Sequence, residues 1–191
     1  NINVLQPTGL RMESNKANSV KLVWSFSGKA TGYEIYRAAS PKGIYRRLKT
    51  IQNADTVTFK NKNLKFNKKY SYKVRAFKKT KSGVEYSEFS NTLTAKTKLA
   101  KPDLKLKRKA ASSMLISWKK VTGASGYQIR YSLKKKSGYK SIQIRKAKSG
   151  TYKKSGLKSK KRYYVQIRAY RMVKGKKVYG SWSATKSIKI R

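Results

Sequence analysis

The sequence has no cysteine and no histidine, and only six of its 191 residues are acidic. Without cysteine, disulfide bonds, thiol nucleophiles and zinc sites with sulfur ligands are excluded. Without histidine, the most common general base is missing as well. No apolar run approaches the ~18 residues that a membrane-spanning helix needs, so we predict no membrane insertion. These absences leave few routes to catalysis and favour a binding or spacing role.

The six acids are too scattered to predict a catalytic or metal-binding cluster. Glycoside hydrolysis needs two convergent carboxylates, and only Glu85 and Glu88 lie close together in the sequence. These two could contact calcium, but two solvated charges beside a loop are the better interpretation, because calcium takes about six to eight oxygen ligands. We therefore predict a protein that is not an enzyme, with no catalytic residue, no cofactor and no metal.

Positive charge, in contrast, is abundant. Fifty Lys and Arg residues give a formal net charge of +44. A charge of this size repels itself and attracts anionic partners. Residues 99–191 hold 29 basic residues and one acid, Asp103, for a net charge of +28, whereas residues 1–98 hold 21 and 5, for +16. The asymmetry directs the search for a partner to the second half of the chain.

The second half also repeats the first. Four segments return in the same order: residues 20–24 as 114–118, residues 32–36 as 126–130, residues 70–77 as 163–170, and residues 86–90 as 179–183. An ordered repeat of this length indicates a duplicated domain rather than a solenoid, whose period is shorter. We predict two domains, residues 1–98 and 99–191, with the boundary just before Pro102.

Within each copy, inward-facing apolar residues recur with a period of two. Val20, Leu22 and Trp24 are the example in the first copy, and such alternation predicts strands with one buried face. Glycine-containing turn signals separate the runs, and no stretch has helical periodicity. Short strands with turns at this spacing favour antiparallel sandwiches. The predicted fold class is all-β.

These residues resemble fibronectin type III domains, and the resemblance covers nearly the whole chain twice. It rests on a tryptophan on the second strand, a Tyr-x-aliphatic pattern on the third, and a leucine followed six positions later by a tyrosine and then by an alanine. The matching residues are Trp24, Tyr33, Ile35, Leu64, Tyr70 and Ala76 in the first copy, and Trp118, Tyr127, Ile129, Leu157, Tyr163 and Ala169 in the second.

The resemblance implies two tandem seven-stranded antiparallel β-sandwiches of the fibronectin type III or immunoglobulin-like kind. It implies that Trp24 and Tyr70, and likewise Trp118 and Tyr163, are buried in the two cores. It also implies a tyrosine corner, in which the hydroxyl of Tyr70 or Tyr163 bonds to the backbone a few residues upstream.

Residues 121–127 and 179–183 further resemble the modules of surface and secreted proteins of Gram-positive Clostridia. This likeness implies an excised piece of a larger extracellular protein, secreted or associated with the cell wall, whose other domains are its neighbours. The loops 78–83 and 172–177 contain no Arg-Gly-Asp, so the integrin-binding role of some animal members is not implied.

The predicted site is a polyanion-binding surface in the second domain. If Tyr163 points inward, strand alternation turns Tyr164, Arg168 and Tyr170 outward, beside Arg130 of the neighbouring strand. Guanidinium groups pair with phosphate or sulfate while aromatic rings stack on sugars or bases, although exposed sheet faces carry such residues without binding too. With the nearby basic clusters, the candidates are Lys134, Lys135, Lys136, Lys160, Lys161, Arg162, Tyr164, Arg168, Tyr170 and Arg130.

Two functions are open at this point. The first is a non-catalytic extracellular tandem module that adheres to an anionic polymer, with teichoic acid, a sulfated glycan or extracellular DNA as the partner. The second is a passive spacer that holds a catalytic or adhesive domain away from the cell wall. An intracellular nucleic-acid protein would explain the charge, but no helix-turn-helix, zinc finger or RNA-binding motif is present.

Overall fold

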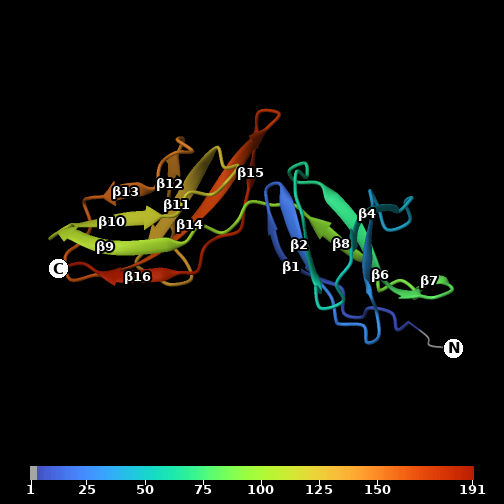
Figure 1. Cartoon of the computed structure of the whole chain (residues 1–191). Coiled ribbons are helices and arrows are strands. Elements are labelled where there is room, and N and C mark those ends of the chain that lie inside the picture. Colours follow the sequence, from blue (N-terminus) through green and yellow to red (C-terminus); the bar gives the residue numbers. More distant parts are fainter. Residues whose placement is uncertain (1–3) are drawn as a thin grey trace. The chain divides into compact units, whose positions relative to one another are not determined.

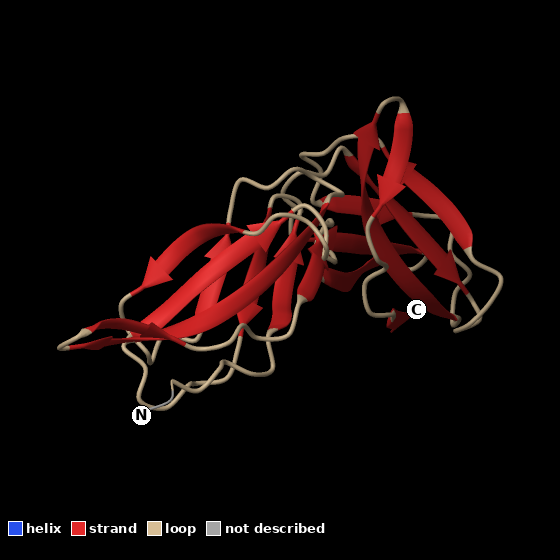
Figure 2. Cartoon of the chain, turned by 90° about the vertical axis from the view of Figure 1, so that its right-hand side faces the viewer, coloured by secondary structure: helices blue, strands red, loops and turns tan. Residues whose placement is uncertain are grey.

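The structure is a computed structural model that describes residues 4–191, so the first three residues of the expected domain 1–98 lie outside the described residues. The chain splits into two compact units, Asn1–Lys98 (unit 1) and Leu99–Arg191 (unit 2). Strands and loops build both units, and no helix occurs within residues 4–191 (Figure 2). Accordingly, none of these residues belongs to a helix long and apolar enough to cross a membrane.

Unit 1 is a sandwich of two antiparallel sheets (Figure 1). The smaller sheet has the order β1-β2-β5, and the larger has the order β4-β3-β6-β7, with β8 also paired to β6. The strands are β1 (Arg11–Lys16), β2 (Ser19–Val23), β3 (Gly32–Ala38), β4 (Arg46–Ile51), β5 (Thr58–Asn61), β6 (Lys69–Thr80), β7 (Gly83–Tyr86) and β8 (Leu93–Lys96).

Unit 2 repeats this topology. Its smaller sheet has the order β13-β10-β9, and its larger sheet has the order β12-β11-β14-β15, with β16 also paired to β14. The strands are β9 (Leu104–Ala110), β10 (Ser113–Trp118), β11 (Gly126–Ser132), β12 (Lys140–Ile144), β13 (Thr151–Lys154), β14 (Arg162–Val173), β15 (Lys176–Tyr179) and β16 (Lys186–Lys189). The predicted all-β fold of two sandwiches is confirmed.

The seventh strand of each sandwich runs in two pieces, so each unit shows eight strands. In unit 1 the pieces β7 and β8 pair with successive parts of β6. Between them, the hydroxyl oxygens of Ser87 and Ser90 accept hydrogen bonds from the backbone N–H groups of Ala76 and Val74, at 2.9 and 3.0 Å. Side-chain hydroxyls thus replace ladder bonds where the strand is interrupted. In unit 2 the Ser183 hydroxyl accepts in the same way from β14.

The core lies between the two sheets of each unit, where the alternation predicts it. In β2 and the next residue, Val20, Leu22 and Trp24 are buried. Trp118 and Tyr163 are also buried, and each residue has 6% of its surface exposed. The predicted burial of the two tryptophans and the two corner tyrosines is therefore confirmed, with Tyr70 at 8% exposure.

The tyrosine corner is present in both units. The backbone N–H of Lys65 donates to the Tyr70 hydroxyl at 3.0 Å, and that of Lys158 donates to the Tyr163 hydroxyl at 2.9 Å. In each case the donor lies five residues upstream, so the ring fills the core while its hydroxyl satisfies a loop amide that would otherwise lose a partner on burial.

Candidate functional site

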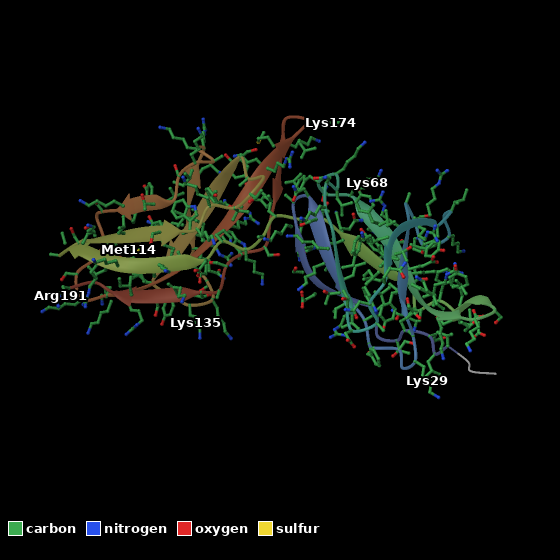
Figure 3. All side chains as sticks on the ribbon, viewed as in Figure 1. Lys29, Lys68, Met114, Lys135, Lys174 and Arg191 are labelled. Carbon is green, nitrogen blue, oxygen red and sulfur yellow. The ribbon has the colours of Figure 1, made fainter. Side chains whose placement is uncertain are left out.

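The predicted lysines of unit 2 lie at one end of its larger sheet. Lys134, Lys135 and Lys136 follow β11, and Lys160 and Lys161 precede β14. Because β11 and β14 are antiparallel and Ser132 pairs with Tyr164, the end of the first strand meets the beginning of the second. Within unit 2, Figure 3 shows Lys135 toward one end and Lys174, in the β14–β15 turn, at the other.

This basic end is open to solvent. The six side chains Lys134, Lys135, Lys136, Lys160, Lys161 and Arg162 are all exposed. Within the described part of the chain, the ion pairs formed by acidic side chains involve Glu13 and Glu34, which both belong to unit 1. Unit 2 has one acidic side chain, Asp103, just before β9. The charge of the basic end is thus balanced by mobile ions or by an anionic partner.

Two arginines form a second cationic feature on the outer face of β11 and β14. Arg130 donates through Nε and Nη2 to Oε1 of Gln166, at 2.8 and 2.5 Å. Arg168 donates through Nε to Oε1 of Gln128 at 2.9 Å. All four side chains therefore lie on one face, and each guanidinium is bonded to a neutral amide.

Aromatic rings hold these guanidinium groups in place. The ring centroid of Trp182 lies 4.2 Å from Cζ of Arg130 and 4.4 Å from Cζ of Arg168. Tyr139 covers Arg130 at 4.5 Å, and Tyr179 covers Arg168 at 3.8 Å. Each contact of this kind contributes on the order of 1 kcal/mol. We call the set Arg130, Arg168, Gln128, Gln166 and Trp182 the arginine face.

The same face in unit 1 contains a carboxylate, and it has Tyr36 and Lys73 where unit 2 has Arg130 and Gln166. Glu34 pairs with Arg75 in the ladder as Gln128 pairs with Arg168. Its carboxylate accepts from Arg75 Nε at 2.9 Å, from Arg47 Nη1 at 2.5 Å and from the Tyr36 hydroxyl at 2.8 Å. Burial raises the pKa of the Glu34 carboxyl, but hydrogen bonds from Arg75, Tyr36 and Arg47 outweigh it and lower the pKa.

Unit 2 therefore has an amide where unit 1 has a carboxylate. Burial lowers the pKa of Arg168, and the neighbouring Arg130 lowers it further, which shows that the charged form is less well stabilised than in water. An arginine nevertheless keeps its charge at neutral pH. An incoming phosphate, sulfate or carboxylate group would supply the counter-charge that Glu34 supplies in unit 1.

Tyr170 was expected to lie exposed on the outer face, and its exposure is where this expectation is wrong. Only 3% of Tyr170 is exposed, and its ring centroid lies 5.8 Å from that of Tyr179. Its ladder partner is Gly126, and a Cβ on that glycine would come within 2.5 Å of the Tyr170 hydroxyl. The ring folds over the glycine because no side chain stands in its way. Tyr170 is therefore a packing residue.

Tyr164 is half-buried at the basic end, between Ser132 of β11 and Ser187 of β16. The aromatic partners Trp182, Tyr139 and Tyr179 were not among the candidates. Their equivalents in unit 1 are Phe89, Tyr45 and Tyr86, which surround Lys73 and Arg75. The recurrence of these aromatic residues in both copies is the sequence signal that could have identified them.

Positive charge is the main chemical feature of these two surfaces. Residues 4–191 contain no cluster of three or more acidic, cysteine or histidine side chains that could hold a metal ion. The lysines of the basic end and the arginines of the arginine face are hydrogen-bond donors with positive charge. Groups of this kind can pair with phosphate, sulfate or carboxylate groups.

The family comparison agrees with the fold of unit 1. Residues 5–93 match the family model described as Fibronectin type III domain, within unit 1. No curated protein matches the chain. The chain is similar to a solved two fibronectin type-III domain segment from chicken tenascin, with 16% identity, a TM-score of 0.49, and coverage of 96% of this chain and 99% of that one.

It is also similar to the FN1-FN3 domains of chicken CNTN1, with 22% identity, a TM-score of 0.43, and coverage of 99% of this chain and 69% of that one. Neither likeness concerns the bacterial branch, so the resemblance to Clostridia modules stays a prediction.

Proposed function

We propose that the chain is a non-catalytic extracellular tandem module of a larger bacterial surface or secreted protein, and that it adheres to an anionic polymer through unit 2. Teichoic acid, sulfated glycans and DNA are the polymers whose chemistry fits. The family match of residues 5–93 supports a module of this type. The net charge of +28 on residues 99–191 supports the partner class.

One observation carries the proposal: the arginine face of unit 2 lacks the carboxylate that pairs with Arg75 and Arg47 in unit 1. If charge served solubility alone, exposed lysines would suffice. Arg130 and Arg168 are instead half-buried and donate to neutral amides, so an anion that supplies the counter-charge would stabilise them. The replacement of Glu34 by Gln128 therefore favours an external anion.

The distance between the basic end and the arginine face favours a chain-like ligand. Arg162 begins β14, and Arg168 lies six residues further along the same strand. At ~3.3 Å per residue these positions are about 20 Å apart. A polymer with charges repeated every few ångströms could contact the basic end and the arginine face together, whereas a small anion could not.

Binding of the full chain to teichoic acid, heparin and DNA at several salt concentrations tests the proposal. Each phosphate contact with a duplex-like polyanion contributes about −0.9 to the slope of log affinity against log salt. We expect Lys135→Glu combined with Lys160→Glu to weaken binding and flatten that slope by about 2. The matched control is Lys105→Glu with Lys107→Glu, two exposed residues on β9 in the smaller sheet.

If both double variants weaken binding equally, net charge alone is responsible and the adhesion site is refuted. If no polymer binds saturably, the passive spacer is the better function.

A further inference from the structure

A pocket of about 340 Å³ opens in unit 2 beside the tyrosine corner. Its walls come from the end of β11, the beginning of β12, the end of β13 and the segment that leads into β14. β12 and β13 are the outermost strands of their respective sheets. The pocket therefore lies between the two sheet edges, and its lining is distinct from the arginine face.

Four lysines line this pocket: Lys134, Lys140, Lys154 and Lys158. No acidic residue lines it. Lys154 is half-buried, and its Nζ donates to the carbonyl oxygen of Ser155 at 2.7 Å and lies 5.3 Å from the ring centroid of Tyr131. Four like charges around one opening repel one another, and an anion placed among them would relieve that repulsion.

The rest of the lining is aromatic and apolar. Tyr131 and Tyr163 have ring centroids 6.4 Å apart, tilted by 44°, and Leu133 and Leu157 complete this side. Ligand pockets of this kind, with a mainly apolar surface and a few charged groups, hold molecules that carry a ring and a polar substituent. The C–H face of a sugar ring can make dispersion contacts with such a surface.

Unit 1 has a hydrogen bond between its two sheets at the corresponding positions. By ladder register, Asn61 stands where Lys154 stands, opposite Val20 and Met114, respectively. In the same way Tyr72 corresponds to Val165. Tyr72 is fully buried, and its hydroxyl accepts from Asn61 Nδ2 at 2.9 Å, which ties the two sheets together.

Neither valine nor lysine can reproduce this bond. Val165 leaves out the ring that fills unit 1, and Lys154 puts a cation in place of the amide. Unit 2 thus lacks this contact between its sheets and has a lysine that lines the pocket in place of the amide.

We propose that this pocket binds a single sugar ring that carries a phosphate or sulfate group. Its volume is near the lower end of the range for small-molecule sites, about 300–1,000 Å³, which suits one ring rather than a chain. The lysines would bind the anionic group and the Tyr131 side would contact the ring. This site goes beyond polymer adhesion by the arginine face, and the sugar is either a free molecule or the terminal unit of a polymer.

Titration of the full chain with glucose 6-phosphate and glucose 6-sulfate, followed by calorimetry and by amide NMR shifts, tests the site. We expect saturable binding to one site with shifts centred on Leu157 and Lys158. Glucose and inorganic phosphate should each bind at least about tenfold more weakly, because each has only half of the required chemistry.

Lys154→Asn, which installs the unit 1 residue, should reduce the affinity at least about tenfold. Lys153→Asn is the matched control, because it removes the same charge from the exposed neighbouring position of β13. Lys158→Ser provides a second lining variant, and the NMR spectrum shows whether each variant is folded.

Equal weakening by Lys153→Asn and Lys154→Asn, or an absence of saturable shifts around the pocket, overturns the proposal. Displacement of a bound polymer by glucose 6-phosphate would identify a polymer terminus as the source, and absence of displacement would identify a free sugar. Either result keeps the site. Failure of polymer adhesion is seen separately, in the charge-reversal variants that address the other surface.

Discussion

Replacing Glu34 with glutamine removes the negative charge that holds Arg75 and Arg47 in unit 1. Glutamine keeps the shape but has one acceptor oxygen, so one of the two arginines meets an amide donor instead of an acceptor. A hydrogen bond to a charged group contributes about 1.5–3 kcal/mol. The Arg47 side chain is 55% exposed, so its pair with Glu34 is screened and adds little.

The Arg75 pair is better protected, with side-chain exposures of 23% for Arg75 and 3% for Glu34. We therefore expect Glu34→Gln to lower the free energy of unfolding of unit 1 by about 2 kcal/mol at neutral pH. Urea denaturation of the full chain, followed by amide NMR signals of β3 and β6, measures unit 1 separately from unit 2.

The pH dependence of the unfolding free energy tests the ion pair more specifically than its value at neutral pH. The pKa of Glu34 is lowered in the folded state, against about 4.3 in an unfolded chain. Its stabilising effect is therefore fully present above the unfolded value and is lost as the pH falls through the lowered folded value. In strong acid the protonated Glu34 resembles glutamine, so the difference between wild type and variant should shrink toward zero. A difference that is equally large in acid and at neutral pH would refute the ion-pair account.

Three further changes have defined outcomes. Gln128→Glu should stabilise unit 2 in urea denaturation by pairing with Arg168 and should weaken polyanion binding; stronger binding would contradict the anion role of the arginine face. Tyr163→Phe should cost about 1–2 kcal/mol because the Lys158 N–H loses its buried acceptor, and an unchanged melting temperature would mean that this bond adds nothing. Gly126→Ala should cost about 1–3 kcal/mol in denaturation experiments, since the new Cβ would collide with the Ile144 carbonyl and the Tyr170 ring; a neutral effect would show that the β11–β14 ladder shifts easily.

Much of the fold can be predicted from the sequence because it depends on patterns of residues that are close together in the chain. Trp24 and Trp118 occupy repeated positions in alternating runs, and the leucine–tyrosine spacing defines the corner at Tyr70 and Tyr163. Each of these features depends on residues close together in the chain. The same holds for the lysine clusters at the basic end, which lie in turns.

What the sequence could not predict depends on contacts between distant segments. Tyr170 alternates correctly along β14, yet Gly126 across the ladder leaves a space into which its ring folds. A comparison of the two copies shows glutamate at position 34 and glutamine at position 128. The role of this difference becomes clear only from the strand register, which places Arg75 opposite Glu34 and Arg168 opposite Gln128. The pocket likewise depends on residues from different sheets, such as Tyr131 and Lys154.

The interruption of the seventh strand affects how readily the two sandwiches of one chain could exchange strands. The pieces β7 with β8, and β15 with β16, form the outer edge of each larger sheet, and an unpaired strand edge is a template for pairing with another chain. Two similar sandwiches on one polypeptide are always at high local concentration, a setting in which misassembly between domains is common. Four-residue pieces, with β15 and β16 rich in lysine, offer no continuous template. We therefore expect the break to reduce strand exchange between the two copies while both are folding.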